Sequence, residues 1–212
     1  MTASTVSPAE VDRFNALADR WWDRAGPMRP LHAMNPARIA WIAARCAPAA
    51  GQRLLDVGCG AGLAAEALAL RGFDVLGIDA AEDVIAAAED LLAEGARFPV
   101  ITALEVIEHV PDPAAFVEVL VALLAPGGKL FLSTLNRTAR SLLIAKLGAE
   151  YVLRLLPVGT HAWRQFLTPV ELGTMLREAG ARVTDTAGLS PGATGWRATR
   201  DLGVNYLLAA EV

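Results

Sequence analysis

The chain has 212 residues, of which 54% are hydrophobic and 20% charged, and a net charge of −4. This composition excludes a disordered chain, and without a basic excess nucleic acid is a poor candidate partner. Two cysteines cannot form a disulfide framework, so a reducing, cytoplasmic location is expected. No uncharged stretch approaches the ~20 residues of a membrane span, and the first residues lack the apolar core of a signal peptide.

Helical patterns open the chain. Ser7, Pro8 and Glu10 predict a capped first helix, and Asn35-Pro36 predicts the start of a second. The apolar side of the second helix would carry Ile39, Ile42, Ala43 and Cys46. We expect residues 1–50 to form a helical lid within a single domain of residues 1–212.

From residue 53 onward, short apolar strands alternate with helices. Strands are expected at Arg53–Val57, Asp74–Ile78, Val100–Leu104, Lys129–Ser133, Arg182–Ala187 and Val204–Ala210. Helices are expected at Leu63–Arg71, Ala81–Glu94, Asp112–Leu124 and from Thr168 to near Gly180. This alternation predicts an α/β fold, a mostly parallel sheet with helices on both faces. The last two strands have no helix between them, so they can pair antiparallel.

A glycine loop, Asp56–Gly62 (DVGCGAG), follows the first strand, where α/β sheets bind ligands. Leu63 stands where a dinucleotide motif would have glycine, and Asp56 would repel a pyrophosphate. The same carboxylate suits a cationic amine, and Asp79, ending the second strand, can accept hydrogen bonds from ribose hydroxyls. A ligand with a ribose, an ammonium and no phosphate is S-adenosylmethionine. The alternative is a structural glycine turn beside two acidic residues.

The loop resembles the glycine motif of class I methyltransferases, whose fold is Rossmann-like. Further motifs make the chain resemble the ubiquinone biosynthesis O-methyltransferase family. They are Trp21-Trp22-Asp23, Pro30–Arg38 (PLHAMNPAR), Glu105–Val110 (EVIEHV), Ser133–Thr138 (STLNRT), Gly148–Tyr151 (GAEY), Gly159–His161 (GTH) and Val204–Tyr206 (VNY). The resemblance implies O-methylation of polyprenylated catechols or phenols, with S-adenosylmethionine as the methyl donor.

By this resemblance, four residues match positions that contact the cofactor: Arg38, Gly58, Asp79 and Leu104. Arg38 would reach the methionine carboxylate, and Leu104 would pack on the adenine. The alternatives are a surface arginine and an ordinary core leucine. With Asp56 and Gly60 of the loop, these residues make up the expected cofactor site, in a core of residues 51–135.

Glu105, Glu108 and His109 follow the third strand and are the candidates for chemistry. A phenol is mostly protonated at neutral pH, so a base or a metal must assist its attack on the methyl group. The two carboxylates and the imidazole could hold Mg²⁺, which the resemblance implies in parts of the family. Alternatively, His109 is a general base without metal, with His161 as a second candidate. A third possibility is that the motif only shapes the pocket.

Residues 138–160 are apolar with basic edges and could form a core helix or lie on a bilayer. The resemblance favours the bilayer, and with it peripheral contact with the inner face of the membrane and with other quinone-synthesis enzymes. Residues 165–212 would supply the C-terminal helix and strands.

The chain departs from the family between Asp79 and Phe98, where only eighteen residues intervene. A βαβ unit takes about 30 residues, so the edge strand that follows Asp79 in the family is expected to be missing. We therefore predict a six-stranded sheet with Asp74–Ile78 at its edge, helix Ala81–Glu94 opposite Leu63–Arg71, and weakened cofactor binding. Alternatives are a methyltransferase for another small molecule or a non-catalytic subunit of a quinone-synthesis complex. A nicotinamide-dependent oxidoreductase is disfavoured by Asp56 and Leu63.

Overall fold

The computed structural model describes residues 21–26, 28–46, 50–79, 84–143 and 165–212. The predicted capping box at Ser7, most of the apolar insertion and His161 lie outside the described residues. None of the helices in the described ranges is long and apolar enough to cross a membrane.

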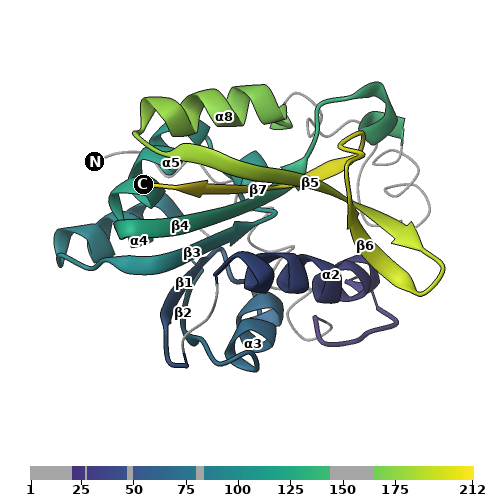
Figure 1. The fold of residues 1–212 in the computed structure, drawn as a ribbon, viewed down its shortest axis with the longest axis horizontal. Helices are drawn as coiled ribbons and strands as arrows, with labels where there is room; N and C mark the ends of the chain where they lie inside the picture. The colour runs from purple at the N-terminus through teal and green to yellow at the C-terminus, as the bar shows by residue number, and fades with distance from the viewer. Residues whose placement is uncertain (1–20, 27, 47–49, 80–83, 144–164) are drawn as a thin grey trace.

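The described residues form a seven-stranded sheet in the order β2-β1-β3-β4-β7-β5-β6 (Figure 1). The strands are β1 (Arg53–Val57), β2 (Asp74–Ile78), β3 (Phe98–Leu104), β4 (Leu124–Leu135), β5 (Arg182–Gly192), β6 (Gly195–Thr199) and β7 (Asn205–Glu211). The first four are parallel to one another, whereas β7 runs antiparallel to β4 and β5. This arrangement confirms the predicted mostly parallel sheet with an antiparallel C-terminal strand.

Helices cover both faces of the sheet, because neighbouring residues of its strands point to opposite sides. The helices are α2 (Arg29–Cys46), α3 (Leu63–Ala69), α4 (Val84–Ala93), α5 (Pro113–Ala122) and α8 (Pro169–Glu178), with the 3-10 turn η1 at Ile107–His109. Leu54 packs in an apolar cluster with α2 and α3, whereas Leu55 packs in a second cluster with α4, α5 and α8. The prediction that α4 lies opposite α3 is therefore confirmed.

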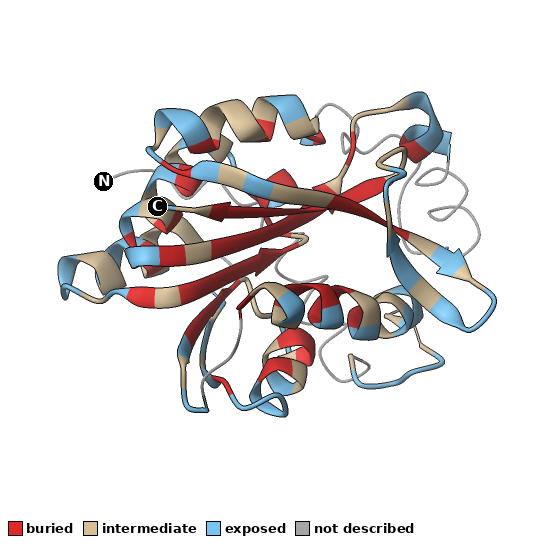
Figure 2. Ribbon diagram, in the orientation of Figure 1, coloured by how far each residue is buried: buried red, intermediate tan, exposed pale blue. Residues whose placement is uncertain are grey.

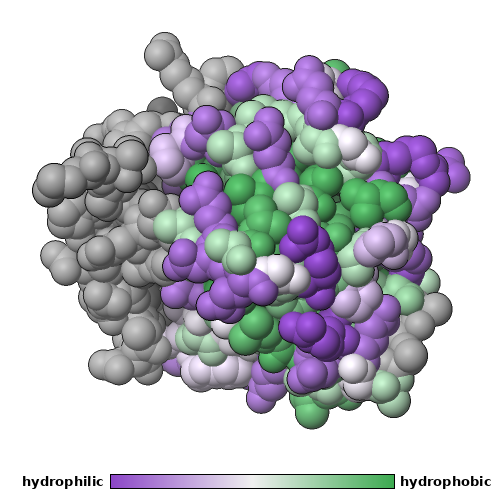
Figure 3. Space-filling model, turned by 90° about the vertical axis from the view of Figure 1, so that its left-hand side faces the viewer, coloured by the Kyte–Doolittle hydropathy of each residue, from purple (hydrophilic) through white to green (hydrophobic). Residues whose placement is uncertain are grey.

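The outer strands are much less buried than the central ones. Figure 2 shows β1, β3, β4 and β7 mostly buried, while β2 and β6 carry exposed residues. The end of the molecule where β3 and β4 begin carries hydrophilic side chains around a hydrophobic centre (Figure 3). The glycine loop lies at the other end, after β1.

The second helix begins at Arg29, not at Asn35 as predicted, so Pro36 lies inside it. Proline removes one helical hydrogen bond, which is why it suggested a helix start. The turn before Pro36 has an added tertiary contact, because His32 Nε2 is 2.8 Å from the carbonyl oxygen of Trp21. Of the predicted inner face, Ile39, Ile42 and Cys46 are buried, whereas Ala43 is half-buried.

The prediction of six strands was wrong by one, because β5 continues into a hairpin with β6. The sequence Ser190-Pro191-Gly192 is typical of a turn, yet it pairs with β6 at the edge of the sheet, where proline costs no interior hydrogen bond. Trp196 of β6 packs against the apolar cluster under α2, which gives this hairpin a hydrophobic anchor.

At the opposite side, β2 is the edge of the sheet, as predicted. Among the described residues between Asp79 and Phe98 there is one helix, α4, and no strand. Leu76 in the middle of β2 is accordingly 42% exposed.

Candidate active site

The glycine loop between β1 and α3 is pressed between two apolar side chains. Gly58 has φ +71°, and a Cβ atom there would lie 2.4 Å from Val106 Cγ2. Gly60 has φ +54°, and a Cβ atom there would lie 2.8 Å from Trp21 Cζ2. Both positions therefore require glycine, for backbone conformation and for space.

Asp79 joins the end of β2 to this loop. Its Oδ2 accepts a 2.6 Å hydrogen bond from the backbone N–H of Gly60. The backbone N–H groups of Gly58 and Cys59 both donate to the carbonyl oxygen of Ile78, which adds two further connections. The structure thus brings Gly60 and Asp79 together, and the Asp79 side chain remains exposed where a ribose could reach it.

Asp56 lies at the buried end of the same region, with 1% of its surface exposed. Its Oδ1 accepts a 2.6 Å hydrogen bond from Thr102 Oγ1, while Oδ2 is buried with no hydrogen-bond partner among the described residues. Burial raises the pKa of Asp56 to about 6, although Thr102 and the charge of Arg38 act in the opposite direction.

Arg38 is buried on α2 with 4% of its surface exposed, so it is not the surface arginine of the alternative interpretation. Its Nη1 is buried and has no hydrogen-bond partner in the described part of the chain. Desolvation lowers its pKa, while the charges of Glu105 and Asp56 oppose that change. A buried cationic donor and a buried carboxylate oxygen, each lacking a partner, fit the carboxylate and ammonium of an amino-acid moiety.

Leu104 ends β3 with 8% exposure and belongs to the apolar cluster on the α2 side. Its contact with an adenine stays a prediction.

Glu105 and Glu108 are held by consecutive residues of β4. Ser133 Oγ donates a 2.7 Å bond to Glu105 Oε1, and Thr134 Oγ1 donates a 2.9 Å bond to Glu108 Oε2. Glu105 has φ +59°, a conformation that costs a non-glycine residue roughly 1 kcal/mol or more. Its backbone N–H is fixed by a 3.0 Å bond to the carbonyl oxygen of Ser133. The strained turn thus places both carboxylates at the end of β4.

The magnesium site expected from Glu105, Glu108 and His109 is not formed. Within the described ranges, no group of three or more histidine, cysteine, aspartate or glutamate side chains could hold a metal ion. Burial and the neighbouring Glu105 raise the pKa of Glu108, whose side chain is turned into the protein toward Thr134 Oγ1. His109, by contrast, is exposed on η1. These residues therefore do not fit a resident Mg²⁺, and no chemical step is assigned to one.

The sequence did not predict the polar side chains that hydrogen-bond the candidate site residues and hold them in place. Asn35, Thr102, Ser133 and Thr134 each bond a candidate residue. Three of them lie inside motifs already singled out, PLHAMNPAR and STLNRT, so the motifs themselves were the available signal. Thr102 lies inside a buried strand and carries no such signal.

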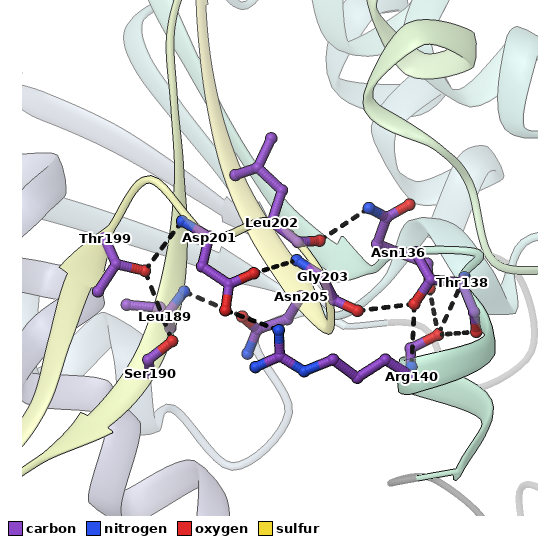
Figure 4. A network of polar contacts seen from close by, with 11 residues as sticks. Asn136, Thr138, Arg140, Leu189, Ser190, Thr199, Asp201, Leu202, Gly203 and Asn205 are labelled. Carbon is purple, nitrogen blue, oxygen red and sulfur yellow. Dashed lines mark hydrogen bonds and ion pairs between the residues drawn. The ribbon is translucent and has the colours of Figure 1, made fainter.

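A polar network fixes the chain where it leaves β4 (Figure 4). Asn136 Nδ2 donates to the carbonyl oxygen of Leu202 at 2.8 Å, and Arg140 forms a 2.7 Å ion pair with Asp201. The start of the apolar insertion is therefore tied to the loop that precedes β7, at the end of the sheet where β1, β3 and β4 finish.

Residues 31–186 match a family model described as a methyltransferase domain. The chain is 44% identical to the ubiquinone biosynthesis O-methyltransferase of Xanthomonas axonopodis pv. citri (strain 306), with 98% of this chain and 95% of that protein aligned. It is 43% identical to the protein of the same name from Pseudomonas aeruginosa (strain UCBPP-PA14), with 98% of each aligned. Both alignments extend over 229 residues, more than the 212 residues of this chain, so these relatives contain aligned positions that this chain lacks.

Among solved structures, the magnesium protoporphyrin IX methyltransferase of Synechocystis PCC 6803 with bound SAH matches with a TM-score of 0.63 at 21% identity, covering 94% of this chain and 96% of that one. A SAM-dependent methyltransferase from Aquifex aeolicus matches with a TM-score of 0.55 at 16% identity, covering 95% and 98%. At these identities the likeness concerns the fold, which is that of class I methyltransferases.

Proposed function

Because the chain belongs to the ubiquinone biosynthesis O-methyltransferase family, we propose that it transfers a methyl group from S-adenosylmethionine to a ring hydroxyl of a polyprenylated phenol or catechol. The observation that carries this proposal is a pair of buried polar atoms, Asp56 Oδ2 and Arg38 Nη1, that have no hydrogen-bond partner among the residues that the structure describes. The carboxylate of Asp56 matches the ammonium of the donor's methionine part, and the guanidinium of Arg38 matches its carboxylate. Asp79, which is bonded to Gly60, could accept hydrogen bonds from the ribose.

The donor supplies an electrophilic methyl group on a sulfonium. The residues of this chain bind and orient it: Arg38 takes the carboxylate, Asp56 the ammonium and Asp79 the ribose hydroxyls. Gly58 and Gly60 let the loop pack against Val106 and Trp21 in the conformation that would receive the donor. The acceptor oxygen loses its proton, the new O–CH₃ bond forms as the S–CH₃ bond breaks, and S-adenosylhomocysteine leaves.

We assign the proton transfer to His109, which is exposed at the carboxyl end of β3 and can pass the proton to water. Glu105, fixed by Ser133, orients the acceptor ring. Glu108 is buried against Thr134, and burial raises its pKa, which favours the neutral form, so we assign it to the wall of the pocket.

The polyprenyl tail needs an apolar path. We propose that residues 138–160, which lie largely outside the described residues, supply it together with peripheral contact with the inner face of the membrane. Contacts with other quinone-synthesis enzymes belong to the same proposal. A cytoplasmic location follows from this role.

A second candidate function is that of a non-catalytic subunit, because β2 is the edge of the sheet and relatives contain positions that this chain lacks. The adenine end of the donor would lie beyond Asp79, next to this edge, so donor affinity could be too low for turnover.

One experiment separates the two functions. The purified protein is mixed with S-adenosylmethionine and a short-chain prenyl catechol, and methylated product and S-adenosylhomocysteine are quantified by mass spectrometry. Equal amounts of both products, with a large loss of turnover in His109→Ala, support the enzyme. Calorimetric binding of the donor without any transfer supports the non-catalytic subunit, and absence of donor binding contradicts both.

A further inference from the structure

Asn35 joins two parts of the candidate site through a single side-chain amide. It lies on α2 with 5% of its surface exposed. Its Nδ2 donates a 3.0 Å hydrogen bond to the carbonyl oxygen of Leu63, and its Oδ1 accepts a 2.9 Å bond from Arg38 Nε. Leu63 is the first residue of α3, directly after the glycine loop. The amide therefore connects the guanidinium of Arg38 to the loop–helix junction.

The two hydrogen bonds permit only one orientation of the amide. A carbonyl oxygen can only accept and a guanidinium can only donate, so reversing the amide of Asn35 would set donor against donor at Arg38 and acceptor against acceptor at Leu63. Arg38 is three residues further along the helix, which places both side chains on the same face of α2. Asn35 thus fixes one edge of the guanidinium and leaves Nη1 without a partner among the described residues.

We propose that Asn35 is a positioning residue for the methyl donor. It acts through Arg38, by aiming Nη1 at the α-carboxylate of the donor's amino-acid moiety. This inference rests on the proposed function, because it presumes a donor with that carboxylate. A merely structural role would be to dock α2 on α3, and the two roles differ in which ligands they affect.

The test compares two ligands that share the adenosine part. S-adenosylhomocysteine carries the amino-acid moiety, whereas 5′-methylthioadenosine has the adenine, ribose and thioether but no carboxylate or ammonium. We expect Asn35→Ala to weaken S-adenosylhomocysteine binding about tenfold, the usual effect of losing one hydrogen bond that orients a charged group. Affinity for 5′-methylthioadenosine should stay within about twofold of wild type, because that ligand does not use Arg38.

Three further variants sharpen this comparison. Arg38→Ala should show the same selective loss, and combining it with Asn35→Ala should add almost nothing, since both act through one contact. Asn205→Ala is the matched control: Asn205 is also a buried asparagine, 7% exposed, and its Oδ1 accepts a 3.0 Å bond from the backbone of Leu189 away from the glycine loop. It should lower thermal stability without changing the ratio of the two affinities.

Equal weakening of both ligands by Asn35→Ala, or no weakening of either, would overturn the inference while leaving the proposed function intact. Failure of the wild-type protein to bind S-adenosylhomocysteine would instead refute the proposed cofactor, and the inference with it. Should Asn35→Ala not fold, Asn35→Ser takes its place, because its shorter side chain cannot bond Arg38 and Leu63 at the same time. A smaller loss confined to S-adenosylhomocysteine then supports the inference, and equal weakening of both ligands contradicts it.

Discussion

Thr102 Oγ1 on β3 donates a 2.6 Å hydrogen bond to Asp56 Oδ1 on β1, and so fixes a carboxylate whose other oxygen is buried without a partner among the described residues. The two residues are paired in the parallel ladder between these strands. A buried ionised carboxylate lowers the stability of the ligand-free protein, because it has lost its contact with water. A bound cation would give it a partner. Two pH dependences follow from it.

The first concerns ligand binding. The pKa of Asp56 is raised to about 6 in the free protein, and an ammonium binds better to the ionised form. Affinity for S-adenosylhomocysteine should therefore fall as pH decreases through 6, by about tenfold between pH 7 and pH 5. Calorimetry at pH 5, 6 and 7 measures this, a range below the ~7.7–8.0 pKa of a free α-amino group. In Asp56→Asn the affinity should be lower and flat with pH; a slope that survives this change would place the titrating group elsewhere.

The second concerns stability. A pKa raised from 3.8 to about 6 means that the folded state holds the proton more tightly than the unfolded state. The corresponding stability is present below pH 3.8 and is lost as pH rises through 6, by up to about 3 kcal/mol. Asp56→Asn removes this loss, so its free energy of unfolding relative to wild type should rise by up to about 3 kcal/mol between pH 4 and pH 7.5. Urea denaturation across this range provides the measurement, and parallel curves for the two proteins would contradict the assignment.

The ribose contact gives a third prediction. Asp79→Ala should weaken S-adenosylhomocysteine binding by roughly ten- to hundredfold, because it removes a charge-assisted hydrogen bond to the ribose and the Asp79–Gly60 bond that shapes the loop. Asp74→Ala is the matched control, since Asp74 is an exposed aspartate at the other end of the same strand. If both variants bind alike, Asp79 does not contact the ligand.

The glycine loop gives a fourth. Gly58→Ala introduces both a strained φ of +71° and a clash with Val106, whereas Gly62→Ala introduces strain alone, since a Cβ atom at Gly62 would meet no neighbour within 4 Å. Gly62→Ala should cost about 1 kcal/mol of unfolding free energy, and Gly58→Ala clearly more, with loss of donor binding. Val106→Ala should partly rescue Gly58→Ala in denaturation and binding measurements. Identical behaviour of the two alanine variants would show that Val106 does not restrict the loop.

The parts of the fold that depend on local pattern could be predicted from the sequence. Alternation of apolar strands with helices fixes a parallel sheet, and the short interval after Asp79 leaves no room for a further strand, which is why the edge position of β2 was predictable. The hairpin of β5 and β6 could not be predicted, because Ser190-Pro191-Gly192 has the composition of a turn. Its pairing with β6 depends on the packing of Trp196 against the apolar cluster at α2, which is a tertiary contact.

The site residues that are close in sequence could be predicted, whereas the contacts between residues from distant segments could not. Asp56 lies near the end of β1, Gly58 and Gly60 follow it in the same short segment, and Asp79 follows the neighbouring strand, so chain order places them together. The bond from Thr102 to Asp56 and that from Asn35 to Arg38 depend on side-chain directions that no motif records. For the same reason the spacing of Glu105, Glu108 and His109 suggested a metal site that their burial and hydrogen bonds do not support.

The edge position of β2 has a consequence for the exchange of its amide hydrogens. The N–H of Asp74 donates to Gln52 and the carbonyl of Ile78 accepts from Gly58, so alternate residues of this parallel strand bond inward to β1. Val75 and Gly77 alternate with these residues, and their backbone N–H groups point away from β1, toward the open edge of the sheet. The amides of Val75 and Gly77 should therefore exchange quickly with solvent deuterium, and those of Leu76 and Ile78 slowly. If another strand pairs with this edge of β2, only the amides of Val75 and Gly77 should become protected.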